Sequence, residues 1–140
     1  MTTAIDTNVL VALWNEDDTL NTLARSALDA ALGRGSLVIA APVFAELLAA
    51  PFRNEAFLDS FCRETGISVD WNLDETVWRT AGRAFRAYVG RRKTLRGAGP
   101  RRILADFLIG AHALQNGFRL LTLDEGLFRA AFPKLVIVGV

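Results

Sequence analysis

Short apolar runs recur along the chain and alternate with longer stretches in which apolar residues have helical spacing. Most of these runs are rich in leucine or β-branched residues, as buried parallel strands are. The predicted strands cover Thr2–Ile5, Leu37–Ala40, Ile67–Asp70, Arg119–Thr122 and Leu135–Val138. After the first strand, the polar triplet Asp6-Thr7-Asn8 leads at once into more apolar sequence, so a helix is expected to begin there.

Helical patterns fill the intervals between the strands. The predicted helices cover Thr19–Leu32, Val43–Ala50, Glu55–Glu64, Asp74–Tyr88, Ile103–Gln115 and Asp124–Phe132. Pro42 suits the first turn of the helix that follows it, and Gly66 suits a C-terminal cap. The one long segment that is predicted to be a loop is Gly90–Pro100.

Strands that alternate with helices predict an α/β fold, a three-layer α/β/α sandwich with a mostly parallel sheet of about five strands. The length of 140 residues predicts one domain, residues 1–140. In sheets of this kind, ligands bind beyond the carboxyl ends of the strands, where the strand order reverses. The chemistry should therefore be sought at that edge.

Composition excludes several classes of protein. No apolar run reaches the length of about 18 residues that would span a membrane, and no basic leader precedes an apolar segment. Cys62 is the only cysteine, so no internal disulfide forms, and a reducing, cytoplasmic location is expected. A single cysteine with a single histidine also excludes a Cys/His zinc site.

Charge is distributed unevenly, although the net charge is only +1. Nine basic residues and no acid lie between Arg79 and Arg102, whereas the rest of the chain has seven basic and 15 acidic residues. Such asymmetry predicts that one face meets a polyanion. The alternative is a solvated helix face and loop. The candidate contacts are Arg86, Arg91, Arg92, Lys93, Arg96, Arg101 and Arg102.

Four acids stand close to predicted strand ends. Asp6 follows the first strand and Glu46 lies in the helix after the second. Asp124 lies two residues past the fourth strand, and Asp106 lies in the first turn of the helix that leads to that strand. Each acid also has a structural alternative, such as a turn or a helix N-terminus. A parallel sheet would nevertheless bring all four together.

Carboxylates that share one crevice repel each other and raise one another's pKa values unless a cation is present. Mg²⁺ or Mn²⁺ is the suitable partner because both ions prefer oxygen ligands. One ion or two would fit these acids, and two-metal sites of this kind cleave phosphodiesters. An acidic crevice beside a basic segment therefore predicts metal-dependent chemistry on a nucleic acid.

Four stretches, "IDTNVL", "APVFAEL", "ADFLIGAHAL" and "LLTLDEGLFR", resemble the acidic motifs of PIN-domain ribonucleases. The resemblance is strongest to the VapC-type toxins of prokaryotic type II toxin–antitoxin systems, and it covers nearly the whole chain in order and spacing. Asp6, Glu46, Asp106 and Asp124 correspond to the first to fourth acids of the family in turn. Asn8 and Thr122 correspond to polar positions beside the first and fourth acids.

The resemblance implies a PIN-like fold and a Mg²⁺- or Mn²⁺-dependent endoribonuclease that hydrolyses RNA, is cytoplasmic, forms a homodimer and is inhibited by a partner antitoxin. The four acids would be the catalytic residues and metal ligands, with Glu46 binding directly or through water. Asn8 and Thr122 would hold these carboxylates and waters in place. The basic segment then becomes the candidate RNA-binding surface, although an acidic antitoxin segment is an alternative occupant.

Three other classes of protein stay open: a phosphatase, a signalling domain and a binding module. A haloacid-dehalogenase-like phosphatase needs an Asp where this chain has Asn8. A receiver-type signalling domain needs an acidic pair at the first strand, where only Asp6 is present, although Asp70 and Lys134 leave the class open. A binding module that captures RNA or protein without cleaving it is the third possibility.

The remaining conspicuous side chains are expected to be structural. His112 lies six residues after Asp106, about 240° around a helix, so the two side chains do not share a face. A structural or surface role is therefore predicted for His112. Trp14, Trp71 and Trp78 are predicted to be core residues rather than platforms on which bases stack.

Overall fold

The computed structural model describes residues 1–94 and 102–140. A five-stranded sheet with the order β3-β2-β1-β4-β5 forms its centre, and every neighbouring pair of strands is parallel. The strands are β1 Thr2–Ile5, β2 Ser36–Ala40, β3 Ser68–Asp70, β4 Arg119–Thr122 and β5 Ile137–Gly139. The order reverses at β1, which lies between β2 and β4, so the predicted switch point is at the end of β1.

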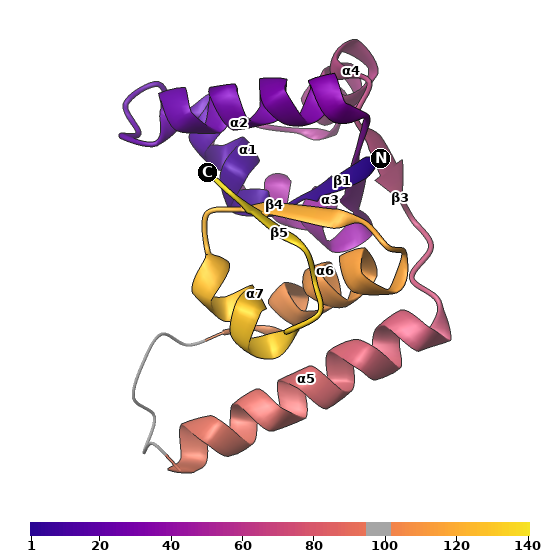
Figure 1. The fold of residues 1–140 in the computed structure, drawn as a ribbon. Helices are drawn as coiled ribbons and strands as arrows, with labels where there is room; N and C mark the ends of the chain where they lie inside the picture. The colour runs from indigo at the N-terminus through magenta and orange to yellow at the C-terminus, as the bar shows by residue number, and fades with distance from the viewer. Residues whose placement is uncertain (95–101) are drawn as a thin grey trace.

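Helices cover both faces of the sheet, which confirms the predicted three-layer α/β/α class (Figure 1). The helices are α1 Thr7–Trp14, α2 Asn21–Arg34, α3 Ala41–Leu47, α4 Glu55–Thr65, α5 Glu75–Thr94, α6 Leu104–Gln115 and α7 Glu125–Ala131. Helix α2 crosses one face above α1, whereas α6 and α7 lie on the other face with the long α5 outside them. Helix α3 contacts both α1 and α6 and so connects the two helical layers.

Strands β1, β2 and β4 are buried over most of their length, because helices cover both of their faces. Ile5 of β1 and both Leu120 and Leu121 of β4 have no exposed surface. Phe107 and Ile109 of α6 are buried against them to the same degree, at 0% and 1% exposure. The rigid centre of the molecule therefore includes the strands and the helix that carry the candidate acids.

Three predicted boundaries are wrong in an informative way. Helix α3 ends at Leu47 rather than residue 50, because the residue before Pro51 disfavours helical geometry. Helix α5 extends to Thr94, and its last turn holds three basic residues that favour a helix C-terminus. The predicted loop is therefore helical over residues 90–94, and its remainder lies outside the described residues. Strand β5 begins at Ile137, because a turn closed by the Leu135 amide occupies the preceding positions.

The tryptophan prediction holds only for Trp14. Its ring lies edge-on to Phe57 and Phe61 of α4, with centroids 5.2 and 5.1 Å away. Trp71 and Trp78 are 62% and 51% exposed, so their assignment to the core is wrong. The buried face of α5 is instead made by small and β-branched residues, Val77, Thr80 and Ala81.

His112 is structural, as expected, and wholly buried in α6. Its Nε2 lies 2.9 Å from Oδ2 of Asp70 at the end of β3. This contact ties the helix that begins near Asp106 to the edge of the sheet. Within residues 1–94 and 102–140, no helix is long and apolar enough to cross a membrane.

We predict that Gly66→Ala lowers the free energy of unfolding by about 1 kcal/mol. Gly66 ends α4 with a φ of 75°, in the left-handed region where a Cβ is strained. Gly82→Ala is the matched control, because Gly82 lies inside α5 and an added Cβ would meet no atom within 4 Å. The same substitution there should raise stability by up to about 1 kcal/mol. Urea unfolding of both variants checks the opposite signs, and an equal effect at the two positions would contradict the prediction.

Candidate active site

The central strand delivers the first acid to the carboxyl edge of the sheet. Ile5 of β1 is in register with Leu121 of β4, and the Asp6 amide donates to the Leu121 carbonyl at 2.9 Å. The next residue of β4 is Thr122, which therefore stands beside Asp6. Two segments more than a hundred residues apart in sequence meet here because parallel strands end at the same edge.

Both oxygens of the Asp6 carboxylate accept a hydrogen bond. The Thr122 hydroxyl donates to Oδ2 at 2.7 Å, and the Thr7 amide donates to Oδ1 at 2.8 Å. The Asp6 residue is only 6% exposed, so these donors replace the water that its carboxylate has lost. The carboxylate is consequently held in one orientation before any ligand binds.

Burial raises the pKa of Asp6 from 3.8 to about 6. The hydrogen bonds from Thr122 and Thr7 act in the opposite direction, and the charges of Asp106 and Glu46 raise the pKa further. Two more of the predicted acids are therefore near enough to repel the Asp6 carboxylate. The burial of one acid among others is the electrostatic pattern expected of a functional site.

Glu46 reaches the site from α3 and is held by Thr7. The Thr7 hydroxyl donates to Oε1 of Glu46 at 2.7 Å, while the amide of the same residue donates to Asp6. One threonine thus orients two acids. The sequence analysis did not select Thr7, and its place between Asp6 and Asn8 in the polar triplet was the available signal.

Asp106 lies in the first turn of α6, and its carboxylate also caps the start of that helix. One of its oxygens accepts from the Ile103 amide at 3.1 Å, as an acid at a helix start commonly does. Its pKa is nevertheless raised, chiefly by burial and also by the charge of Asp124, whereas the Ile103 amide and Arg102 lower it. Asp106 is therefore near enough to both Asp6 and Asp124 for their charges to repel.

Asp124 precedes α7, but its side chain does not cap that helix. Its carboxylate instead forms an ion pair with the guanidinium of Arg102, through Nη1 to Oδ2 and through Nη2 to Oδ1 at 3.5 Å. The sequence analysis placed Arg102 among the candidate RNA contacts. The ion pair with Asp124 joins residues 22 positions apart and was not foreseen.

The two expected supporting residues lie at the site. The Thr122 hydroxyl donates to Asp6 and accepts from the Asp124 amide at 2.9 Å, so it connects the first and fourth acids. The Asn8 side chain accepts from the Leu123 amide at 3.2 Å. Asn8 thereby fixes the connection between β4 and α7, which carries Asp124.

The sequence profile of the PIN domain matches residues 3–133. The chain belongs to the PIN-domain family. A comparison with curated protein sequences gives no significant match.

Several solved structures share the fold of this chain over nearly their full length. A chain of VapBC2 from Rickettsia felis, bound to a DNA fragment from its promoter, is 19% identical with a TM-score of 0.70, and the match covers 100% of this chain and 99% of that chain. VapBC-1 from nontypeable Haemophilus influenzae is also 19% identical, with a TM-score of 0.64 and coverage of 99% and 98%. The sarcin–ricin loop cleaving toxin VapC20 from Mycobacterium tuberculosis is 18% identical, with a TM-score of 0.61 and coverage of 93% and 95%.

The donor set of this PIN domain fits a hard divalent cation, because the four acids supply only carboxylate oxygens and those near Asp6 repel it. Within the described part of the chain, however, no three acidic, histidine or cysteine side chains are close enough together to hold a metal ion. Glu46 is bonded to Thr7, and Asp124 is paired with Arg102. Their role as metal ligands stays a prediction.

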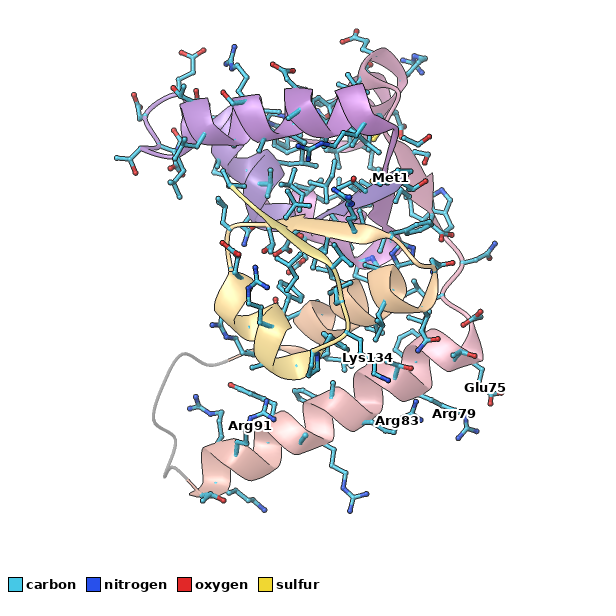
Figure 2. All side chains as sticks on the ribbon, in the orientation of Figure 1. Met1, Glu75, Arg79, Arg83, Arg91 and Lys134 are labelled. Atoms are coloured by element: carbon cyan, nitrogen blue, oxygen red, sulfur yellow. The ribbon has the colours of Figure 1, made fainter. Side chains whose placement is uncertain are left out.

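Most of the described basic residues of the segment Arg79–Arg102 lie along α5, the helix outside α6 and α7 (Figure 2). Arg79 pairs with Glu75 on the exposed surface, at 2.7 Å. Arg91 and Lys93 are exposed in the last turn of α5, and Arg92 lies over the Tyr88 ring at 6.0 Å. The predicted contacts Arg96 and Arg101 lie outside the described residues.

We predict that Asp6→Asn stabilises the metal-free PIN domain at pH 7.5. The folded-state pKa of about 6 lies above the ordinary value of 3.8, so the folded protein binds this proton more tightly than the unfolded chain does. The contribution of Asp6 to stability therefore falls as the pH rises from about 4 to about 6, and the ionised carboxylate destabilises the fold above that range. The variant should gain about 2 kcal/mol at pH 7.5 and much less at pH 4.5.

Urea unfolding in the presence of a chelator measures this difference. Asp17→Asn is the control, because Asp17 is exposed and its substitution should change stability by less than about 0.5 kcal/mol. A variant that is less stable than the parent at pH 7.5 would show that burial of the Asp6 charge does not strain the fold.

Proposed function

We propose that this PIN domain is a divalent-metal-dependent endoribonuclease and the toxin of a toxin–antitoxin pair. The observation that carries the proposal is the buried Asp6 carboxylate, held by Thr122 and Thr7 and repelled by Asp106 and Glu46. A structural aspartate gains nothing from two acidic neighbours. An acid that binds a cation does, because the cation removes the repulsion.

The relatives support the choice of reaction and partner. VapC20 is a sarcin–ricin loop cleaving toxin, which is an activity on RNA. VapBC2 and VapBC-1 carry the names of two-component pairs, and another chain of this fold comes from a toxin–antitoxin complex of Klebsiella pneumoniae. An RNA substrate and an antitoxin partner are proposed for this chain on that basis. The homodimer rests on the family resemblance alone.

In the proposed mechanism, Asp6, Asp106 and Asp124 would hold one or two Mg²⁺ or Mn²⁺ ions, and Glu46 would contribute directly or through water. Ions bound there would make a water molecule more acidic and would neutralise charge that develops at the phosphate. Thr122 and Thr7 keep both oxygens of Asp6 in place. Asn8 keeps the backbone beside Asp124 in place through Leu123. No histidine base is required, and the buried His112 is engaged with Asp70.

We predict that purified protein cleaves RNA at discrete positions in Mg²⁺ or Mn²⁺ and not in chelator. Asp6→Asn and Asp106→Asn should each lower the rate by about 100-fold or more, because each removes a charge that the metal needs. The exposed Asp17→Asn should cleave at the parent rate. Gel analysis of total cellular RNA, followed by mapping of the new ends, measures the rate and the target.

Three other results would redirect the assignment. RNA binding without cleavage by folded, antitoxin-free protein would favour a binding module. Release of inorganic phosphate from small phosphate esters would favour a phosphatase. Cleavage that survives both substitutions would mean that the acidic edge, formed by Asp6, Glu46, Asp106 and Asp124, is not the nuclease site.

We also predict that the last turn of α5 contacts RNA phosphates. Replacing Arg91, Arg92 and Lys93 together by glutamine should weaken RNA binding and make its salt dependence less steep. The slope of log K against log salt should fall by up to about 2, at about 0.7 for each contact with single-stranded RNA. Filter binding in chelator, where no cleavage is expected, measures the slope.

The matched control carries three glutamine substitutions on the opposite helical layer, at Arg25 and Arg34 of α2 and Arg63 of α4. These arginines are exposed, so their loss changes net charge equally. If both triple variants lose the same slope, RNA is attracted by net charge alone and α5 is not a binding surface.

A further inference from the structure

The positively charged side chain of Arg102 lies at the acidic edge. The guanidinium of Arg102 contacts Asp124 through two nitrogens, and the two side chains are only 23% and 30% exposed. The same guanidinium lowers the pKa of Asp106. Arg102 therefore acts on two of the four proposed metal ligands at once.

This ion pair differs from the two arginine–carboxylate pairs on helix surfaces. Arg79–Glu75 and Arg129–Glu125 join residues one helical turn apart, and their side chains are 45% to 78% exposed. Pairs of that kind contribute little because water screens both charges. The Arg102 pair is partly shielded from water, so it is the stronger interaction.

The backbone presents the guanidinium in this position. The Arg102 amide donates to the Tyr88 hydroxyl of α5 at 2.7 Å, and the next amide, that of Ile103, donates to Asp106. The residue is thus fixed between the end of α5 and the start of α6. The side chain therefore extends to Asp124 from a backbone position that these two hydrogen bonds hold.

A guanidinium that contacts a carboxylate opposes metal binding there, because the two cations repel each other and compete for the lone pairs of the same two oxygens. Oδ2 of Asp124 is the atom in contact with Nη1 of Arg102. Metal binding through Asp124 is therefore weakened for as long as Arg102 stays in this position, and a bound ion would push the guanidinium away.

We propose that Arg102 is a built-in counter-ion of the acidic site, which neutralises Asp124 while the metal is absent and which competes with an incoming divalent cation. This inference rests on the proposed metal site. In this inference, Arg102 lowers the affinity of the acidic site for divalent cations. The residue is a positioning residue, since it acts through Asp124.

The test is Mn²⁺ binding by the full chain, free of antitoxin and RNA, followed by the electron paramagnetic resonance signal of free Mn²⁺. Arg102→Gln should bind Mn²⁺ about tenfold more tightly than the parent, a size that is common for coupling between two ligands. Arg102→Lys keeps the charge and should stay close to the parent. Arg129→Gln removes an arginine from a surface pair on α7 and should have no effect.

A second measurement needs no variant that alters the site. The arginine Nε–H signals of ¹⁵N-labelled parent protein should show one large change when Mg²⁺ is added, at Arg102, while the signal of Arg129 stays constant. An Arg102 signal that does not change at saturating Mg²⁺ would overturn the inference. So would Mn²⁺ affinity in folded Arg102→Gln that equals or falls below that of the parent.

The inference and the proposed function fail in different ways. RNA cleavage in Mn²⁺ with unchanged metal affinity in Arg102→Gln overturns the role of Arg102 and leaves the nuclease in place. Absence of Mn²⁺ binding in both the parent and Arg102→Gln overturns the inference together with the metal-dependent mechanism. If Arg102→Gln binds Mn²⁺ more tightly than the parent but neither protein cleaves RNA, the role of Arg102 as a counter-ion is supported. Only the proposed nuclease activity is then overturned.

Discussion

A buried carboxylate at the end of the central strand is the constraint around which the rest of this domain is arranged. Asp6 is 6% exposed and follows β1, the strand at which the strand order of the sheet reverses. An isolated charge in such a position would oppose folding. Thr122 from the neighbouring strand and the amide of Thr7 make the burial tolerable, and both depend on the parallel register of β1 with β4. The acid is thus inseparable from the topology that surrounds it.

The fold manages the other acids by three different physical means. A hydroxyl group from Thr7 holds Glu46, a backbone amide at the start of α6 holds Asp106, and a guanidinium holds Asp124. Each partner is weaker or more easily exchanged than a divalent cation would be. The metal-free domain can therefore fold with its acids partly neutralised and still keep them available. Sites that violate the usual rules of burial in this way are where function is expected.

The sequence predicts the site better than it predicts the contacts within it. Asp6 could be selected because an acid after a short apolar run must lie at the edge of a parallel sheet, and that inference depends only on chain order. The importance of Thr7 and the pairing of Arg102 with Asp124 could not be predicted, because both depend on which side chains meet across segments far apart in sequence. Trp78 of α5 was misjudged for a related reason. Hydrophobicity predicts that a side chain is buried somewhere, but not that α5 has filled its buried face with smaller residues.

The basic helix α5 and the acidic edge are physically connected through Arg102. Tyr88 of α5 accepts from the amide of Arg102, and the guanidinium of Arg102 meets Asp124. A spatial chain of this kind does not by itself couple two sites, because coupling requires an element with two arrangements. Arg102 supplies that element if a metal ion displaces it from Asp124. A polyanion bound along α5 would then favour the displaced guanidinium by offering it another negative charge, and by linkage the metal would strengthen the binding of the polyanion.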